Sequence, residues 1–145
     1  MNVKNEIKTG FIGWFDILGY RSFLERSDLA RAVNVVREVQ AKIHSAGAER
    51  FEGIVASVPA LQKEEKAVAR EAFASMIWMI FADTVLLGLP IPEGEKIWKA
   101  RLRIATFLEL AKYVHLDFFF AGLPLRGAVS FGSFYVHDGA SLFAG

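Results

Sequence analysis

The longest apolar stretch of the chain, Met76 to Pro92, carries a single acidic residue, Asp83, close to its centre. The stretch is nearly long enough to cross a bilayer, but a lone carboxylate at the bilayer centre costs roughly 2.5–3.5 kcal/mol on insertion scales. Two buried strands joined at or near Asp83 explain the same residues without that cost. The sequence therefore predicts a β-hairpin over Met76 to Pro90, in a cytoplasmic protein without a membrane span.

Length and composition limit the class of protein further. The 145 residues fit one domain, 1–145, and 53% of them are hydrophobic, which excludes a disordered chain. A net charge of +1 provides no basic footprint for nucleic acid. The absence of cysteine excludes disulfides, thiolate nucleophiles and cysteine-type metal sites.

Local patterns predict the remaining elements, apart from Glu49 to Val58, which favours neither helix nor strand. Phe11 to Leu18 is aromatic and β-branched and precedes Gly19, as in a buried strand that ends in a tight turn. The other expected elements are a short helix over Arg21–Arg26, a helix capped by Ser27 and closed by Gly47, a helix over Ala60–Ala74, a helix over Glu93–Val114, one strand turning or bulging into another over Leu123–Val136, and a strand over Ser141–Ala144.

The helix over Glu93–Val114 has the strongest helical pattern in the chain. Its expected buried stripe consists of Ile97, Ala100 or Arg101, Ile104, Leu108 and Ala111, widened by Phe107 and Val114, with Lys99, Arg103, Glu109 and Lys112 facing water. The order of all elements predicts an α+β fold with a ferredoxin-like split βαβ core, in which an antiparallel sheet has helices on one face. Such a sheet usually needs one more covering element after its last strand, so we expect a domain truncated at its C-terminus.

Asp16 and Asp83 each end a very apolar strand, which is unusual for an ionised carboxylate. A buried carboxylate must be paired, hydrogen-bonded or metal-bound. Each aspartate could cap the turn that follows its strand, or the two could form one shared site where the first strand lies beside the hairpin. Two carboxylates without cysteine or a suitable histidine suit hard cations such as Mg²⁺ or Mn²⁺.

Three motifs, in order along the chain, resemble the signatures of class III nucleotide cyclase domains. Asp16 to Tyr20 resembles the Asp-Ile-x-Gly-Phe signature, and Phe81 to Thr84 resembles the second signature, which has an acid at a hairpin. Leu125 to Gly132 resembles the Leu-Arg-x-Gly-Ile-His-x-Gly strand. The residues of these motifs are most similar to those of the divergent bacterial branch that includes the pyrimidine cyclases of Pycsar antiphage systems.

The resemblance implies a role for individual residues. Asp16 and Asp83 would hold two Mg²⁺ or Mn²⁺ ions, with the Ile17 carbonyl as a further ligand. Backbone amides from Leu18 to Arg21, including those of Gly19 and Tyr20, would bind the triphosphate, and Arg126 would contact phosphate oxygens. The Arg21 side chain could add a second charged contact. The Tyr20 ring could reach the nucleotide or pack at the strand end.

The sequence also departs from the family pattern. Purine-specific relatives have a base-reading lysine or glutamate four residues before the second acid, where this chain has Met79. Met79 is either a core residue or part of base selection. Ala82 replaces a frequent glycine, and the helix that carries the family's transition-state asparagine and arginine has no counterpart in the sequence.

The resemblance implies an enzyme that converts a nucleoside triphosphate, UTP or CTP, to a 3′,5′-cyclic nucleotide and pyrophosphate, as a second-messenger synthase in antiphage defence. The alternative is a catalytically degenerate cyclase-like module for nucleotide sensing or dimerisation. Family sites lie between two subunits, and the aromatic load of this chain also suggests a partner surface. We therefore expect a head-to-tail homodimer with Asp16 and Asp83 in a cleft that faces the partner.

Overall fold

The structure, a computed structural model, describes residues 5–26, 28–81, 83–137 and 141–144. Its elements follow the predicted order of one strand, three helices, two strands, one helix and two strands. Their bounds are β1 (Asn5–Ile17), α1 (Tyr20–Arg26), α2 (Leu29–Ser57), α3 (Lys63–Ala74), β2 (Ile77–Phe81), β3 (Thr84–Pro90), α4 (Ile97–Phe120), β4 (Leu125–His137) and β5 (Ser141–Ala144).

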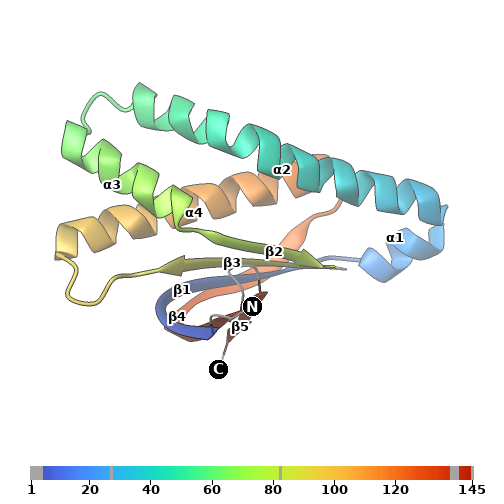
Figure 1. Cartoon of the computed structure of the whole chain (residues 1–145). Coiled ribbons are helices and arrows are strands. Elements are labelled where there is room, and N and C mark those ends of the chain that lie inside the picture. Colours follow the sequence, from blue (N-terminus) through green and yellow to red (C-terminus); the bar gives the residue numbers. More distant parts are fainter. Residues whose placement is uncertain (1–4, 27, 82, 138–140, 145) are drawn as a thin grey trace.

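The strands form one antiparallel sheet in the order β2-β3-β1-β4-β5. β3 lies between β1 and β2, and β1 lies between β3 and β4, which is the split βαβ arrangement expected from the sequence. Helices α2, α3 and α4 cover one face of this sheet, and α1 lies beyond one end of it (Figure 1). The predicted α+β fold is confirmed.

The apolar stretch around Asp83 forms the expected hairpin. β2 pairs with β3 from Ile77 opposite Gly88 to Phe81 opposite Thr84. β3 is an interior strand, and its residues 84–89 are all buried, which explains the apolar run. Within the described parts of the chain, no helix has both the length and the apolar character to span a membrane.

Strands β1 and β4 are longer and more regular than the sequence suggests. They pair continuously from Asn5 opposite His137 to Ile17 opposite Leu125, so the turn or bulge predicted within Leu123–Val136 is wrong. Gly127 allows close approach of the two strands, since a Cβ there would lie 2.0 Å from the Trp14 carbonyl oxygen. The glycine therefore permits strand pairing instead of interrupting it.

Helix α2 differs from its prediction at both ends. The Asp28 side chain accepts a hydrogen bond from the Ala30 N–H at 3.2 Å, so Asp28 is the N-cap. The predicted cap, Ser27, lies outside the described residues.

The helix also continues beyond Gly47 to Ser57. Phe51 and Val55 of this extension are buried against α3, and the Phe51 ring stacks on Phe73 with centroids 4.5 Å apart. Burial of these side chains outweighs the cost of a helical glycine, which is about 1 kcal/mol.

Helix α4 buries a face that overlaps only in part with the one predicted, since Phe107, Ala111 and Val114 are buried as expected. Ile97 and Leu108 of the expected stripe are 73% and 51% exposed, whereas Arg103, expected in water, is 3% exposed. The buried residues still recur at helical spacing; they are Arg103, Thr106, Phe107, Leu110, Ala111, Val114, Asp117 and Phe118. Apolar periodicity missed part of this face because two charged residues, Arg103 and Asp117, and the polar Thr106 belong to it.

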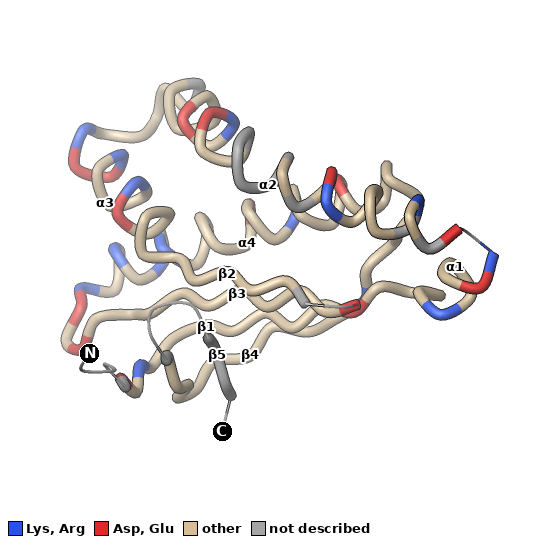
Figure 2. The backbone as a smooth tube through the Cα atoms, turned by 45° about the vertical axis from the view of Figure 1, so that its right-hand side comes forward, with Lys and Arg blue, Asp and Glu red and all other residues tan. Residues whose placement is uncertain are grey.

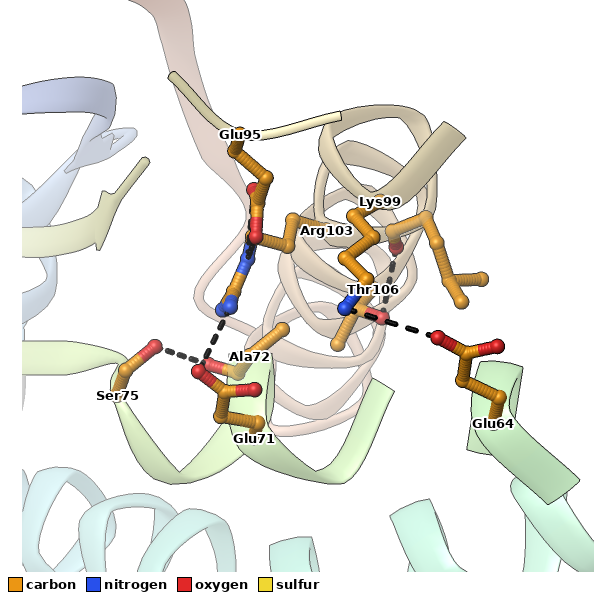
Figure 3. Close-up of polar contacts among 9 residues, drawn as sticks. Glu64, Glu71, Ala72, Ser75, Glu95, Lys99, Arg103 and Thr106 are labelled. Atoms are coloured by element: carbon orange, nitrogen blue, oxygen red, sulfur yellow. Dashed lines mark hydrogen bonds and ion pairs between the residues drawn. The ribbon is translucent and has the colours of Figure 1, made fainter. Parts of the chain in front are cut away.

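Arg103 is buried because two carboxylates surround its guanidinium group (Figure 3). Its Nε donates to Glu95 at 2.8 Å, and its Nη2 donates to Glu71 of α3 at 2.8 Å. Burial lowers the pKa of Arg103, but these hydrogen bonds outweigh burial and hold the pKa above its ordinary value. The cluster ties α3 and the segment before α4 to α4 itself.

Apolar side chains pack on both faces of the sheet. The main core lies between sheet and helices and includes Phe15, Leu87 and Phe107. A second cluster on the other face joins Ile12, Phe134 and Val136 to Ile77 and Met79. Because β2 and β4 contribute to this second cluster across two intervening strands, the sheet must curl toward that face.

Candidate active site

Asp16 lies near the end of β1, on the sheet face turned away from the helices. Its neighbours Phe15 and Ile17 are buried in the main core, so strand alternation places Asp16 on the opposite face. In the register of the sheet, Asp16 lies opposite Thr84 of β3 and opposite Arg126 of β4. A central strand thus carries the carboxylate between two defined neighbours.

Asp83, in the hairpin turn between β2 and β3, lies beside the same end of β1. The Ile17 N–H donates to the Asp83 carbonyl at 2.8 Å, which holds the turn beside the end of β1. The Thr84 hydroxyl donates to Asp83 Oδ1 at 3.3 Å, and Thr84 is itself 7% exposed. The buried hydroxyl therefore helps to orient the second carboxylate.

Arg126 forms an ion pair with Asp16 across the strand register. Its Nε and Nη2 each lie 3.2 Å from Asp16 Oδ2. The side chains of Asp16 and Arg126 are 32% and 71% exposed, so the pair is open to solvent. The second carboxylate oxygen of Asp16 is not used by this pair, and much of the guanidinium group faces outward.

These groups line one open cleft. Its lining residues are Trp14, Asp16, Asp83, Thr84, Arg126, Gly127 and Ala128. Figure 2 shows acidic residues at the end of the sheet nearest α1, while most charges elsewhere lie on the helices. The structure thus brings together Asp16, Asp83 and Arg126, which the sequence analysis singled out, and it adds Trp14 and Thr84, which that analysis did not assign to a site. Strand alternation could have marked Trp14, which precedes Asp16 by two residues on the same strand. Thr84 pairs with Asp16 across β1 and β3, and this register is known only from the folded sheet.

The turn between β1 and α1 supports part of the expected phosphate-binding segment. Gly19 has a φ of +70°, in the left-handed region that favours glycine. The Leu18 N–H donates to the Pro124 carbonyl at 2.8 Å and is therefore used within the fold. The next amides, at the start of α1, have no acceptor within the helix, as at any helix N-terminus.

The side chains of that turn point to different roles. Tyr20 packs against the main core and lies near Phe23, with ring centroids 6.5 Å apart. Of the two alternatives for this ring, the structure favours packing. Arg21 is 92% exposed and pairs with Glu25 at 3.0 Å. It is not among the residues that line the cleft.

Comparison with known proteins identifies the fold. No protein-family model matches the sequence, and no curated protein matches it either. Among solved structures, the adenylyl cyclase CyaB from P. aeruginosa matches 97% of this chain with a TM-score of 0.51 and 10% identity. The dimeric guanylyl cyclase domain of the RhoGC fusion protein from Blastocladiella emersonii matches 92% of it with a TM-score of 0.53 and 8% identity.

The chain has the fold of a nucleotidyl cyclase domain. It spans 68% of the matched CyaB chain and 62% of the matched RhoGC chain. At this level of identity the likeness concerns the fold, and the chemistry of this chain must be argued from its own residues.

The carboxylates of this cleft fit a hard divalent cation only in combination with a ligand. Among the residues that the structure describes, no cluster of three or more His, Cys, Asp or Glu could hold a metal ion by itself. Mg²⁺, however, is commonly held by one or two carboxylates together with substrate phosphates and water. The two cleft carboxylates, Asp16 and Asp83, satisfy that requirement, with the Thr84 hydroxyl as an additional oxygen nearby.

Met79 does not lie in the cleft. It is part of β2, opposite Leu86, and packs against the second apolar cluster. Of the two alternatives left open by the sequence, the structure therefore favours core packing. Ala82, which replaces a frequent glycine of the family, lies outside the described residues.

Proposed function

We propose that this chain is the catalytic domain of a nucleotidyl cyclase, which converts a nucleoside triphosphate to a 3′,5′-cyclic nucleotide and pyrophosphate. In this reaction the ribose 3′-oxygen bonds to the α-phosphorus, the bond from that phosphorus to pyrophosphate breaks, and the 3′-hydroxyl proton is released. The observation that carries the proposal is the convergence of Asp16, Asp83 and Arg126 in one open cleft of a cyclase-like fold.

Each cleft residue has a role in this proposal. Asp16 and Asp83 would hold Mg²⁺ or Mn²⁺, two ions per site, with the Ile17 carbonyl as a further ligand. Bound cations would stabilise negative charge on the phosphates and on the departing pyrophosphate. Arg126 is exposed enough to donate to phosphate oxygens, and the amides of Gly19 to Arg21 at the start of α1 would bind others.

The proposed preference for a pyrimidine base rests on Met79, which stands where purine-specific relatives have a base-reading lysine or glutamate. Met79 cannot donate or accept a charged hydrogen bond, and it packs into an apolar cluster. A purine reader of the lysine or glutamate type is therefore missing from that position, which supports UTP or CTP as substrate. A role as second-messenger synthase in antiphage defence rests on the resemblance of the three motifs to pyrimidine cyclases.

The proposal includes a head-to-tail homodimer whose clefts face the partner subunit. Large apolar side chains are exposed on several elements of this chain, among them Ile97, Leu108, Phe120, Val129 and Phe131. In the proposed homodimer, a partner subunit would cover part of this exposed apolar surface. One of the two structural neighbours above is described as dimeric.

The direct test compares Asp83→Asn with the wild-type chain in the presence of Mn²⁺. We expect the variant to keep its fold, measured by circular dichroism, and to lose nucleotide turnover, measured by product analysis with all four nucleoside triphosphates. Glu52→Gln is the matched control, because Glu52 is an exposed carboxylate on α2, on the other side of the sheet. Turnover by Asp83→Asn at the wild-type rate would refute the assigned metal site.

The same experiment distinguishes the degenerate alternative. Calorimetric titration of the wild-type chain with each nucleotide and Mn²⁺ measures binding separately from chemistry. Binding that depends on Asp83, without any cyclic product, would identify a nucleotide-sensing module instead of an enzyme. Light scattering on the same samples reports the oligomeric state.

A further inference from the structure

Trp14 is an exposed aromatic side chain inside the candidate cleft. The residue is 54% exposed, and it lines the same cleft as Asp16, Asp83 and Arg126. Tryptophan is a large apolar residue that folding normally buries to a high degree. An indole left open beside three charged groups is therefore a candidate binding surface.

The position of Trp14 along β1 places it at a definite separation from the charges. It precedes Asp16 by two residues on the same strand face, which corresponds to about 7 Å between the Cα atoms. In the sheet it lies opposite Leu86 on one side and Ala128 on the other. The cleft thus has a charged end at Asp16 and an aromatic end one strand repeat away.

On the β4 side, the cleft residues beside the indole carry no polar side chain beyond Arg126. On β4, the cleft residues that follow Arg126 are Gly127 and Ala128, which add no polar side chain. Gly127 is also required there, because a Cβ would lie 2.6 Å from a Phe15 ring carbon as well as against the β1 backbone. On the β4 side, the indole is thus flanked by small residues in an open cleft.

We propose that Trp14 is a stacking platform for the nucleobase, while Asp16, Asp83 and Arg126 bind the phosphate end of the same nucleotide. This inference rests on the proposed function. A nucleotide has a charged end and a flat aromatic end, which matches the two ends of the cleft. Stacking on an indole tolerates any base, because every base presents a π-face. Trp14 therefore supplies affinity for the base, and base choice depends on other groups.

The test uses the whole chain with Mn²⁺ and two probes, a nucleoside triphosphate and inorganic tripolyphosphate. For Trp14→Ala we expect the affinity for the nucleotide to fall roughly 5- to 150-fold, which corresponds to the usual range for the loss of one stacked base. The affinity for tripolyphosphate should remain unchanged, because that probe has no base. Trp14→Phe should retain most of the nucleotide affinity.

Intrinsic fluorescence provides a second readout. Nucleotide binding should quench tryptophan emission in the wild-type chain, and Trp14→Phe should remove most of that quenching. Trp98→Phe is the matched control, since Trp98 is 37% exposed and lines a different pocket with Gln62 and Lys96. Quenching should persist in that variant.

The possible outcomes separate this inference from the proposed function. If Trp14→Ala binds nucleotide as tightly as the wild-type chain, stacking is refuted, while binding of tripolyphosphate would still support the phosphate site. If the wild-type chain binds neither probe, both proposals fail. If Trp14→Ala loses both probes together with a dimer seen by light scattering, Trp14 is an interface residue and the stacking role is refuted.

Discussion

Two arginines of this molecule each pair with carboxylates, yet their surroundings differ in almost every respect. Arg103 is 3% exposed and donates to Glu95 and Glu71 at 2.8 Å. Arg126 has a side chain that is 71% exposed and pairs with a single carboxylate, Asp16, at 3.2 Å. The first joins α3, α4 and the segment before α4, whereas the second lies in an open cleft.

The comparison shows that burial, rather than the presence of a charge pair, decides what a pair can do. A buried pair that loses one partner leaves an uncompensated charge in a poorly solvated place, so it is needed for stability. An exposed pair contributes little to folding, because water already solvates both groups. It can exchange its partner for a ligand at small cost, which is what a binding site requires.

The largest effect is expected at Arg103. Arg103→Met should lower the free energy of unfolding by about 3–5 kcal/mol, because Glu95, whose side chain is 7% exposed, would lose its counter-charge. Urea denaturation measures the change. The double variant Arg103→Met with Glu95→Gln should recover part of the loss, since no buried charge remains. A single variant as stable as the wild-type chain would contradict the structural role of this cluster.

The next effect tests the backbone beneath the cleft. Gly127→Ala should lower the free energy of unfolding by about 1–3 kcal/mol, because its Cβ would lie 2.0 Å from the Trp14 carbonyl and force β1 and β4 apart. Gly132→Ala is the matched control on the same strand, where a Cβ meets nothing within 4 Å. We expect that variant to be neutral or up to about 1 kcal/mol more stable. Equal effects of the two variants in urea would contradict the strand packing described above.

Arg126 should show the opposite balance to Arg103. Arg126→Gln should change the free energy of unfolding by no more than about 0.5 kcal/mol. The affinity of this variant for a nucleoside triphosphate should fall roughly 10- to 150-fold, as expected for the loss of a charge-assisted hydrogen bond. Calorimetric titration measures binding, and Arg70→Gln on α3 is the control that should bind normally. A large loss of stability in Arg126→Gln would remove the distinction between the two arginines.

The smallest effect concerns an exposed pair between helices, Arg70 of α3 and Glu52 of α2, at 2.8 Å. The hydrogen bond from Arg70 holds the pKa of Glu52 below its ordinary value of 4.5. Because the pKa is lower in the folded state, the pair stabilises the fold above about pH 4.5, and this contribution is lost as the pH falls through the folded-state pKa. Melting temperatures of Glu52→Gln should therefore depend less steeply on pH in the acid range than those of the wild-type chain. Parallel curves would show that the pair contributes nothing to stability.

Much of the fold follows from local patterns in the sequence. The apolar run interrupted by Asp83 predicted a hairpin, and Phe11 to Leu18 predicted a strand that ends just before Gly19, where β1 ends at Ile17. Both depend on strand periodicity and turn chemistry, which act over a few residues. The order of elements then allowed few sheet topologies, and the structure has the expected one.

Other features depended on contacts between distant segments. The buried face of α4 includes Arg103 because Glu71, 32 residues earlier in the chain, provides a counter-charge. Helix α2 continues through Gly47 because α3 covers its C-terminal part. Hydrophobic periodicity within one helix reveals neither contact, so the predicted end of α2 was wrong and the predicted stripe of α4 was only partly right.

The candidate site shows the same division. The sequence alone marked Asp16 and Asp83, because a carboxylate in an apolar strand requires a partner. Only the register of the sheet placed Arg126, 110 residues away, against Asp16, and only the folded strand showed that Trp14 stays exposed on the same face. Local sequence determines which residues are unusual for their surroundings, whereas strand pairing over long separations determines which of them meet.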